Sequence, residues 1–217
     1  MHAVSLFDIQ KNVAKTAASE VVKVAAICGH SCCCVAFHCD VSDASAVKAA
    51  VAAVVKKWGR LDIVVANAAI IPKATNILSP KFEDELQSVT AVNLHGVLHT
   101  CRTAADAMLA ARSEATLNTT LNTNGKILII GSIMADMVQA GKGHYIMCKA
   151  AARSIGKTLA LEVAGSGINV NILQPGHVTT EGSHAEAARA DVQCIQKHCM
   201  RFSVDLAYHI LASDLIN

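Results

Sequence analysis

A tyrosine, a lysine and an upstream serine form the part of this chain best suited to chemistry. Tyr145 and Lys149 are four residues apart, so on a helix their side chains lie on one face, one turn apart. The phenol of a tyrosine has a pKa of about 10, which a neighbouring ammonium group lowers. Ser132 can hydrogen-bond the oxygen of a carbonyl or an alcohol. Together the three side chains predict proton exchange at a substrate oxygen.

A tyrosine and a lysine at this spacing are also common as an ordinary pair on a helix surface. The neighbouring segments favour the chemical interpretation. An apolar run over 126–130 precedes Ser132, a helical pattern covers 145–164, and a second apolar run over 168–173 leads into Pro175 and Gly176. The predicted order is strand, serine, helix with the Tyr/Lys pair, then strand.

Strand-like and helix-like segments alternate along the whole chain. The alternation predicts βαβ units in a doubly wound α/β domain with a parallel sheet, forming one domain over residues 1–217. Val13, Ala17, Val21 and Val24 mark an apolar helix face, Ser42 is a candidate N-cap, and Gly59 is a candidate helix stop. The predicted strands are 4–8, 32–39, 61–65, 126–130 and 168–173; the predicted helices are 11–26, 43–58, 82–112, 145–164, 181–199 and 203–213, with a loop or frayed helix end over 113–124.

Composition excludes several classes of function. The chain has 217 residues, with 19 basic and 17 acidic side chains and only 3% aromatic residues, so neither charge nor stacking surfaces indicate a nucleic-acid partner. No apolar run reaches the roughly 18 residues of a membrane helix. The first residues carry no secretory pattern. We therefore expect a cytoplasmic protein with no membrane partner.

Nine cysteines, odd in number and unevenly placed, do not predict a disulfide framework. Five of them, with His30 and His38, lie between residues 28 and 39. Metal sites usually show paired ligands at spacings such as C-x2-C, and this stretch has no such pair of pairs. Cysteine here is better interpreted as a small apolar residue of a strand, and no metal site is expected.

The ordered segments and motifs resemble the short-chain dehydrogenase/reductase family, classical type. The resemblance implies a Rossmann-like fold and hydride transfer between a nicotinamide and an alcohol or ketone. It implies that Tyr145 exchanges the proton as acid/base, that Lys149 lowers the pKa of the tyrosine and holds the nicotinamide ribose, and that Ser132 binds the substrate oxygen. Asn93, followed by Gly96, matches the asparagine that supports a water-mediated relay to the lysine; the alternative is a helix-bending core residue.

The resemblance also implies a set of cofactor-binding residues at predicted strand ends. Asp8 matches an acid that binds the adenosine ribose and favours NAD over NADP, and Asp40 with Val41 matches an adenine-contacting pair. Asp8 could instead be a turn acid, and Asp40 a helix N-cap. Beside Asn67, Ala66 and Ala69 depart from the family pattern. The full set is Asp8, Asp40, Val41, Asn67, Ala68, Tyr145, Lys149, Pro175, Gly176, Val178 and Thr180.

Two histidines near this machinery, His144 and His177, are candidate bases by type. No carboxylate is placed in the sequence to orient either ring, and the tyrosine already fills the role of base. We therefore assign both histidines to loops.

The sequence lacks the glycine-rich turn that opens a nicotinamide-binding unit. In the strand order 3-2-1-4-5-6 of the fold, the segment 4–8 matches strand 2, so the central first strand, its turn and its helix are unmatched. Two arrangements follow: strands 2 and 4 pair directly, or the chain is part of a longer product, truncated at the N-terminus and at the C-terminus. We favour truncation, which makes cofactor binding by this chain doubtful.

Two functions follow from these patterns. The first is an NAD-dependent oxidoreductase acting on a small alcohol or carbonyl compound, with a homo-oligomer formed through the helices near 82–112 and 145–164. The alternative is a non-catalytic relative that acts only as an interaction or oligomerisation partner. Keeping Ser132, Tyr145, Lys149 and Asn93 together favours the first.

Overall fold

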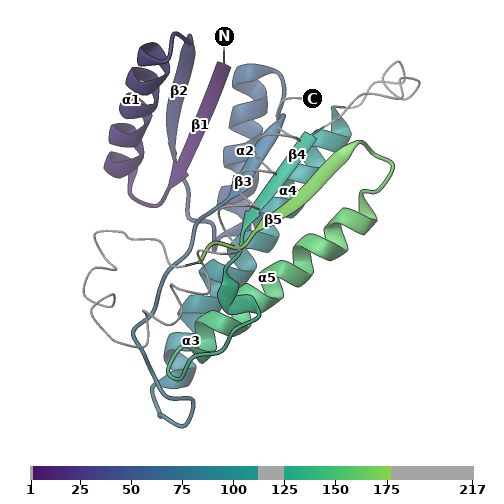
Figure 1. The fold of residues 1–217 in the computed structure, drawn as a ribbon. Helices are drawn as coiled ribbons and strands as arrows, with labels where there is room; N and C mark the ends of the chain where they lie inside the picture. Colours follow the sequence, from purple (N-terminus) through teal and green to yellow (C-terminus); the bar gives the residue numbers. More distant parts are fainter. Residues whose placement is uncertain (1, 112–124, 177–217) are drawn as a thin grey trace.

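The computed structural model describes residues 2–111 and 125–176, and five parallel strands alternate with helices along this part of the chain (Figure 1). The predicted loop over 113–124 and the predicted helices 181–199 and 203–213 lie outside the described residues. The elements are β1 (His2–Asp8), α1 (Lys11–Ile27), β2 (Cys32–His38), α2 (Ala44–Trp58), β3 (Ile63–Ala66), α3 (Phe82–Thr90), a π-helical turn η1 (Ala91–Gly96), α4 (Val97–Ala110), β4 (Gly125–Ile130), a 3-10 turn η3 (Ile133–Ala135), α5 (Gly143–Glu162) and β5 (Ile168–Leu173).

The strands form two parallel sheets. β1 pairs with β2, with Val4 opposite Cys34, and β4 lies between β3 and β5. Among the described strands, β1 and β3 are not hydrogen-bonded to each other, so the arrangement in which these two pair directly is wrong. The predicted α/β fold with parallel strands is confirmed.

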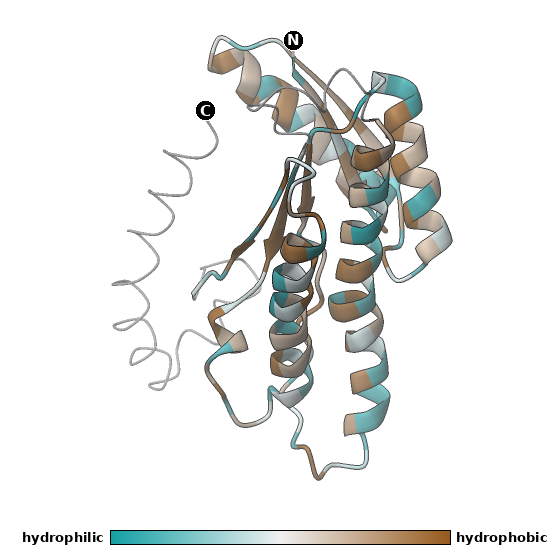
Figure 2. Ribbon diagram, turned by 90° about the vertical axis from the view of Figure 1, so that its right-hand side faces the viewer, coloured by the Kyte–Doolittle hydropathy of each residue, from teal (hydrophilic) through white to brown (hydrophobic). Residues whose placement is uncertain are grey.

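The core lies between the three-stranded sheet and the helices α4 and α5. Ile127 and Ile129 alternate along β4 and are 1% and 0% exposed, which places them on the same face of the strand. Cys101 and Ala104 of α4 and Ala152 of α5 are 0% exposed and belong to the same cluster. Figure 2 shows the two long helices on one side of the apolar strands. Packing of the apolar face of β4 against α5 fixes the position of α5 relative to the end of β4.

The first helix does not bury the apolar face that its sequence predicts. Val13 and Val24 are 50% and 58% exposed, whereas Ala14 and Ala18 are buried. The helix α1 packs against β1 and β2, more extensively against β2, and its buried residues are small alanines. The valine spacing therefore predicted the helix correctly, but it did not predict which side of the helix is buried.

The start of α2 is one residue later than predicted. Asp43, not Ser42, is the N-cap, because its Oδ1 accepts the backbone N–H groups of Ser45 at 2.8 Å and Ala46 at 3.3 Å. A carboxylate at this place also favours the positive end of the helix dipole. Gly59 ends the helix at φ 80°, as predicted, in the left-handed region that glycine enters at no steric cost.

The long helix predicted over 82–112 is interrupted. Between α3 and α4 the backbone forms the π-helical turn η1, with Asn93 buried inside it at 0% exposed. π-helical turns are often found at functional sites. Gly96 ends this turn against Val41, where an added Cβ would approach Val41 Cγ2 to 2.6 Å. The glycine therefore lets η1 approach the loop that follows β2.

No helix of the described residues is long and apolar enough to cross a membrane.

Candidate active site

Ser132 and Tyr145 approach each other from different elements. Ser132 follows β4 and caps η3, where its Oγ accepts the backbone N–H of Met134 at 3.1 Å. The side chain is nearly buried, at 8% exposed. Tyr145 lies in the first turn of α5, and the Ser132 side chain is close enough to its phenol to lower the pKa of that group. The segment after the carboxyl end of β4 thus supplies the serine, and α5 supplies the phenol.

Lys149 completes the group from the next turn of α5. Its Nζ donates a 2.8 Å hydrogen bond to the carbonyl oxygen of Ile130, the last residue of β4. The same nitrogen lies 5.7 Å from the centroid of the Tyr145 ring. Lys149 is only 3% exposed, so this carbonyl holds a buried ammonium group beside the phenol. The structure therefore brings Ser132, Tyr145 and Lys149 together, as the sequence predicts.

The electrostatics of the pair differ from the sequence-based expectation. Burial raises the pKa of the Tyr145 phenol, and the hydrogen bond with Ser132 lowers it in part. Burial also lowers the pKa of Lys149, while the neighbouring Cys148 raises it. The net shift of the Tyr145 pKa is therefore upward, because burial has the largest effect, and the lowering of this pKa by Lys149 stays a prediction.

Asn93 binds backbone rather than lying free in the core. Its Oδ1 accepts the N–H of Ile70 and its Nδ2 donates to the carbonyl oxygen of Ile70, both at 2.8 Å. This pair of bonds fastens η1 to the segment that follows β3. Asn93 thus shapes the loop beside the site, while its relay role stays a prediction.

Among the described cofactor-binding candidates, those that follow a strand lie at its carboxyl end, where ligands of such sheets bind. Asn67 and Ala68 follow β3 and are exposed. Pro175 follows β5, and its carbonyl oxygen accepts the N–H of Ile133 at 3.0 Å. This bond joins the segment of Pro175 and Gly176 to the segment of Ser132. Val178 and Thr180 lie outside the described residues.

The two predicted carboxylates are held by turns. Asp8 ends β1, and its Oδ1 accepts the N–H of Gln10 at 2.6 Å. Asp40 is not a helix N-cap; its Oδ1 accepts the N–H of Ser42 at 2.9 Å and the Ser42 hydroxyl at 2.7 Å. These bonds hold the pKa of Asp40 below its usual range. Val41 follows directly, and its carbonyl oxygen contacts His99 Nδ1 at 3.0 Å.

The Asp40 turn is expected to make stability depend on pH. A carboxyl whose pKa is lower in the folded than in the unfolded state stabilises the fold above its unfolded pKa of about 3.9, and loses that contribution as pH falls through the folded value. The Asp40→Asn variant keeps an acceptor oxygen but cannot ionise. We expect it to be less stable than the wild type at pH 7 and equally stable under strongly acid conditions, measured by urea unfolding. A stability difference that stays constant with pH would contradict this.

His144 is not a loop residue. It is the second residue of α5, fully buried at 0% exposed, and its Nε2 lies 3.3 Å from Glu85 Oε2. The carboxylate that the sequence search did not find comes from α3, 59 residues earlier in the chain. Glu85 lies in the first turn of α3, and no local spacing in the sequence connects it with His144. His177 lies outside the described residues.

A family comparison decides the classification. The model described as enoyl-(acyl carrier protein) reductase matches residues 3–205. The chain belongs to the short-chain dehydrogenase/reductase family. The 3-oxoacyl-[acyl-carrier-protein] reductase FabG of Chlamydia pneumoniae is 36% identical over 142 residues, which cover 65% of this chain and 52% of that protein. The chain spans about half the length of the curated relatives it matches.

Solved members of the short-chain dehydrogenase/reductase family share the fold. A gluconate 5-dehydrogenase from Burkholderia cenocepacia, solved with NADP and tartrate, has a TM-score of 0.70 at 26% identity and covers 87% of this chain and 66% of its own. A 3-ketoacyl-(acyl-carrier-protein) reductase from Brucella melitensis, solved with NADH, has a TM-score of 0.65 at 26% identity and covers 79% and 63%. Both nicotinamide cofactors thus occur among these relatives.

The residues present fit the nicotinamide end of such a cofactor better than its phosphate end. The buried ammonium group of Lys149 and the hydroxyl of Tyr145 supply donors beside Ser132. For the pyrophosphate, the sequence offers no glycine-rich turn between a strand and a helix. The described residues therefore bring together the three side chains that the resemblance assigns to proton exchange, Ser132, Tyr145 and Lys149.

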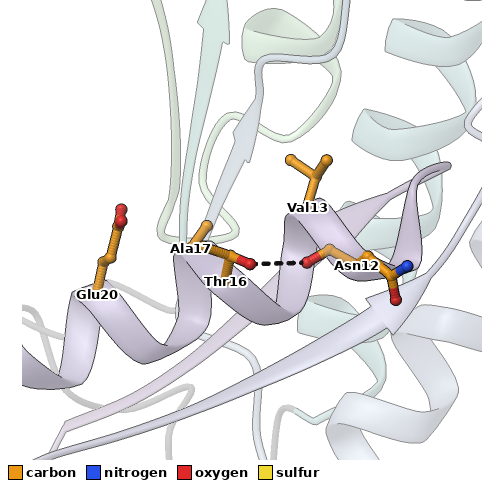
Figure 3. Close-up of a pocket in the computed structure, with 5 residues that line it drawn as sticks. All are labelled: Asn12, Val13, Thr16, Ala17 and Glu20. Atoms are coloured by element: carbon orange, nitrogen blue, oxygen red, sulfur yellow. Dashed lines mark hydrogen bonds between the residues drawn. The ribbon is translucent and has the colours of Figure 1, made fainter.

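A surface hollow on α1 is separate from this site. It is lined by Asn12, Val13, Thr16, Ala17 and Glu20, and the Thr16 hydroxyl donates to the carbonyl oxygen of Asn12 at 3.1 Å (Figure 3). It shares no residue with the site around Tyr145. Within residues 2–111 and 125–176, no three side chains of His, Cys, Asp or Glu gather as metal ligands would.

Proposed function

We propose that the protein of which this chain is at least a part transfers a hydride between a nicotinamide cofactor and the carbon of an alcohol or ketone. The observation that carries the proposal is the convergence of Ser132, Tyr145 and Lys149 at the end of β4. Relatives in the same family carry names of reductases and dehydrogenases. A small alcohol or carbonyl compound is the substrate class that this chemistry serves.

Tyr145 acts as the acid in carbonyl reduction, and the upward shift of its pKa supports this role because it favours the protonated phenol. A protonated phenol donates its proton to the carbonyl oxygen as negative charge develops there. Ser132 hydrogen-bonds the same oxygen and stabilises that charge. The buried ammonium group of Lys149 stabilises the phenolate left behind. In the reverse direction the same three groups accept the proton of an alcohol.

The nicotinamide, when bound, supplies or accepts the hydride. We propose that Lys149 and Tyr145 hold its ribose, and that Asn67, Ala68 and Pro175 border it at the strand ends. The carboxylate of Asp8 repels a 2′-phosphate, which supports NAD as the preferred cofactor over NADP. A cytoplasmic location belongs to the same proposal.

The proposal is tested by titrating the purified 217-residue chain with NADH and with NADPH, followed by turnover assays on ketones and alcohols. We expect weak binding, with NADH preferred, because no glycine-rich turn is present to hold the pyrophosphate. Substitution of Asp8 by Ser should reduce the preference for NADH. Equal affinity for both cofactors in the wild type would contradict the assignment of Asp8.

A second role is association through the helices α3, α4 and α5, with or without turnover. Apolar side chains are exposed on two of these helices: Leu98 and Leu109 on α4 are 42% and 38% exposed, and Met147 and Leu161 on α5 are 46% and 79% exposed. Exposed apolar side chains on neighbouring helices favour a subunit interface. Sedimentation measurements on the purified chain test the proposed homo-oligomer, and a monomer at all concentrations would exclude it.

A further inference from the structure

His144 lies directly before Tyr145 and takes no part in the proton transfer proposed above. Its ring stacks on Phe82 of α3, with the ring centroids 5.2 Å apart and the planes 9° from parallel. The ring is fully buried at 0% exposed. Buried polar atoms are nearly always hydrogen-bonded, so the partners of the two ring nitrogens indicate what the residue does.

The first partner is the backbone of the proposed catalytic residue. The N–H of Tyr145 donates to His144 Nδ1 at 3.0 Å. N–H groups in the first turn of a helix have no acceptor within the helix, and the side chain of the N-cap residue usually provides one. In α5 the N-cap is Lys142, whose ammonium group cannot accept. His144 therefore supplies the acceptor for the residue that carries the phenol.

The second partner is a carboxylate on α3. Because Nδ1 accepts a hydrogen bond, the proton of the neutral ring is on Nε2, which lies 3.3 Å from Glu85 Oε2. The Thr75 hydroxyl donates to the same carboxylate oxygen. The Thr75 bond, and after it the His144 bond, hold the pKa of Glu85 below its usual range. A charged carboxylate is the stronger acceptor, and it fixes the tautomer that Tyr145 requires.

Backbone bonds connect the same network to the loop that follows β3. The N–H of Thr75 donates to the carbonyl oxygen of Gly141 at 2.8 Å, and Lys142 Nζ contacts the carbonyl oxygen of Pro72 at 3.4 Å. At Gly141, with φ 79°, an added Cβ would approach Ala74 Cβ to 3.1 Å. Three segments, the loop, α3 and the start of α5, thus meet at His144.

We propose that His144 is a positioning residue for Tyr145: held by Glu85 and Thr75, it fixes the first turn of α5 and so aligns the phenol with Ser132. This inference rests on the proposed function, because it concerns the residue that exchanges the proton there. The side chains that meet the ring are Glu85 and Phe82 from α3, and the charge of Lys81 helps to lower the pKa of the Glu85 carboxyl.

The tautomer of His144 is the first test and needs no activity. Nitrogen-15 NMR of the full chain, labelled at its ten histidines, is compared with the His144→Phe variant to assign the ring signals. We expect a protonated Nε2 and an unprotonated Nδ1 at neutral pH. A proton on Nδ1 would overturn the proposal, because that nitrogen could not then accept from Tyr145.

The second test follows the phenol itself. Tyr145 and Tyr208 are the chain's two tyrosines, so a Tyr208→Phe background isolates Tyr145 in an ultraviolet absorbance titration. The His144→Phe variant keeps an aromatic ring against Phe82 and removes both nitrogens. We expect the pKa of the phenol to move upward, since misalignment weakens the bond from Ser132 that lowers it. His30→Phe, at an exposed turn, is the control. An unchanged titration in folded His144→Phe overturns the proposal.

A pair of Glu85 variants keeps the proposal testable if His144→Phe does not fold. Gln at this position retains an acceptor oxygen for His144 and Thr75, whereas Ala removes it. We expect Glu85→Ala to mix the two His144 tautomers and to raise the pKa of the phenol, and Glu85→Gln to stay close to the wild type. Identical behaviour of the two variants would show that Glu85 does not hold the ring.

Turnover provides the last readout. We expect His144→Phe to lower kcat about 10- to 100-fold while KM changes less than about threefold, the pattern of a misplaced reacting group. Undiminished kcat in an active, folded variant contradicts positioning. If the wild type shows no turnover, the proposed function fails, while the tautomer and the titration still decide the role of His144.

Discussion

Replacing Tyr145 by phenylalanine is expected to lower turnover about 10²- to 10⁴-fold, the range that a positioned general acid or base contributes. The reason is specific to the hydroxyl. The aromatic ring, its partial burial and the register of α5 are retained, while the proton donor next to Ser132 is lost. Steady-state kinetics with an alcohol or ketone and the preferred nicotinamide measure the effect. Affinity for the cofactor should change by less than about tenfold, since one hydrogen bond to the ribose contributes about 1 kcal/mol.

The Tyr208→Phe variant is the matched control, because it removes the chain's other phenol, which lies outside the described residues and has no assigned role. It should retain the kcat of the wild type. Turnover by Tyr145→Phe at the wild-type rate would exclude the mechanism. If neither the wild type nor the variant turns over, but both associate equally with themselves, the interaction role is favoured instead.

Local spacing was sufficient to predict most of the architecture. Apolar runs predicted all five described strands to within two residues at each end, because short apolar runs bounded by turn residues are typical of strands in parallel sheets. The helix α5 was predicted from the same Tyr/Lys spacing that defines the site. The sequence left open whether β1 pairs with β3. No local pattern in a strand specifies which other strand lies beside it, so the separation into two sheets could not be predicted outright.

What the sequence could not predict comes from contacts between distant segments. The break of the long helix at η1 has no Pro, and Asn93 was recognised without its partner Ile70, 23 residues away. His144 was assigned to a loop because Glu85 lies on another helix. The upward shift of the Tyr145 pKa was not predicted for a related reason. Helical spacing places Lys149 on the same face as Tyr145, but it does not show how deeply the phenol is buried or that the ammonium group binds Ile130.

The strongest separation of function from stability is expected at Lys149. In the Lys149→Met variant the ammonium group beside Tyr145 is lost, and with it the charge that stabilises a phenolate, so turnover should fall at least about 100-fold. Stability should change little. Removing the bond to the Ile130 carbonyl leaves that oxygen without its buried donor, at a cost of about 1–3 kcal/mol. Against this, a buried charge is costly, and apolar replacements of buried charges are often neutral or stabilising.

The cost of burying the charge of Lys149 is indicated by its pKa, which burial lowers. A lysine with a lower pKa in the folded than in the unfolded state destabilises the fold while it is charged, and the wild type gains stability as pH rises through the folded and towards the unfolded value. The Lys149→Met variant lacks this gain. The free energy of unfolding in urea is compared at pH 7 and at pH 10. We expect the Lys149 contribution to raise it at pH 10 in the wild type and not in the variant. Lys157→Met, exposed on the same helix, is the control for both readouts. If Lys149→Met and Lys157→Met retain equal turnover, the ammonium group does not act on Tyr145, and its burial against Ile130 is structural.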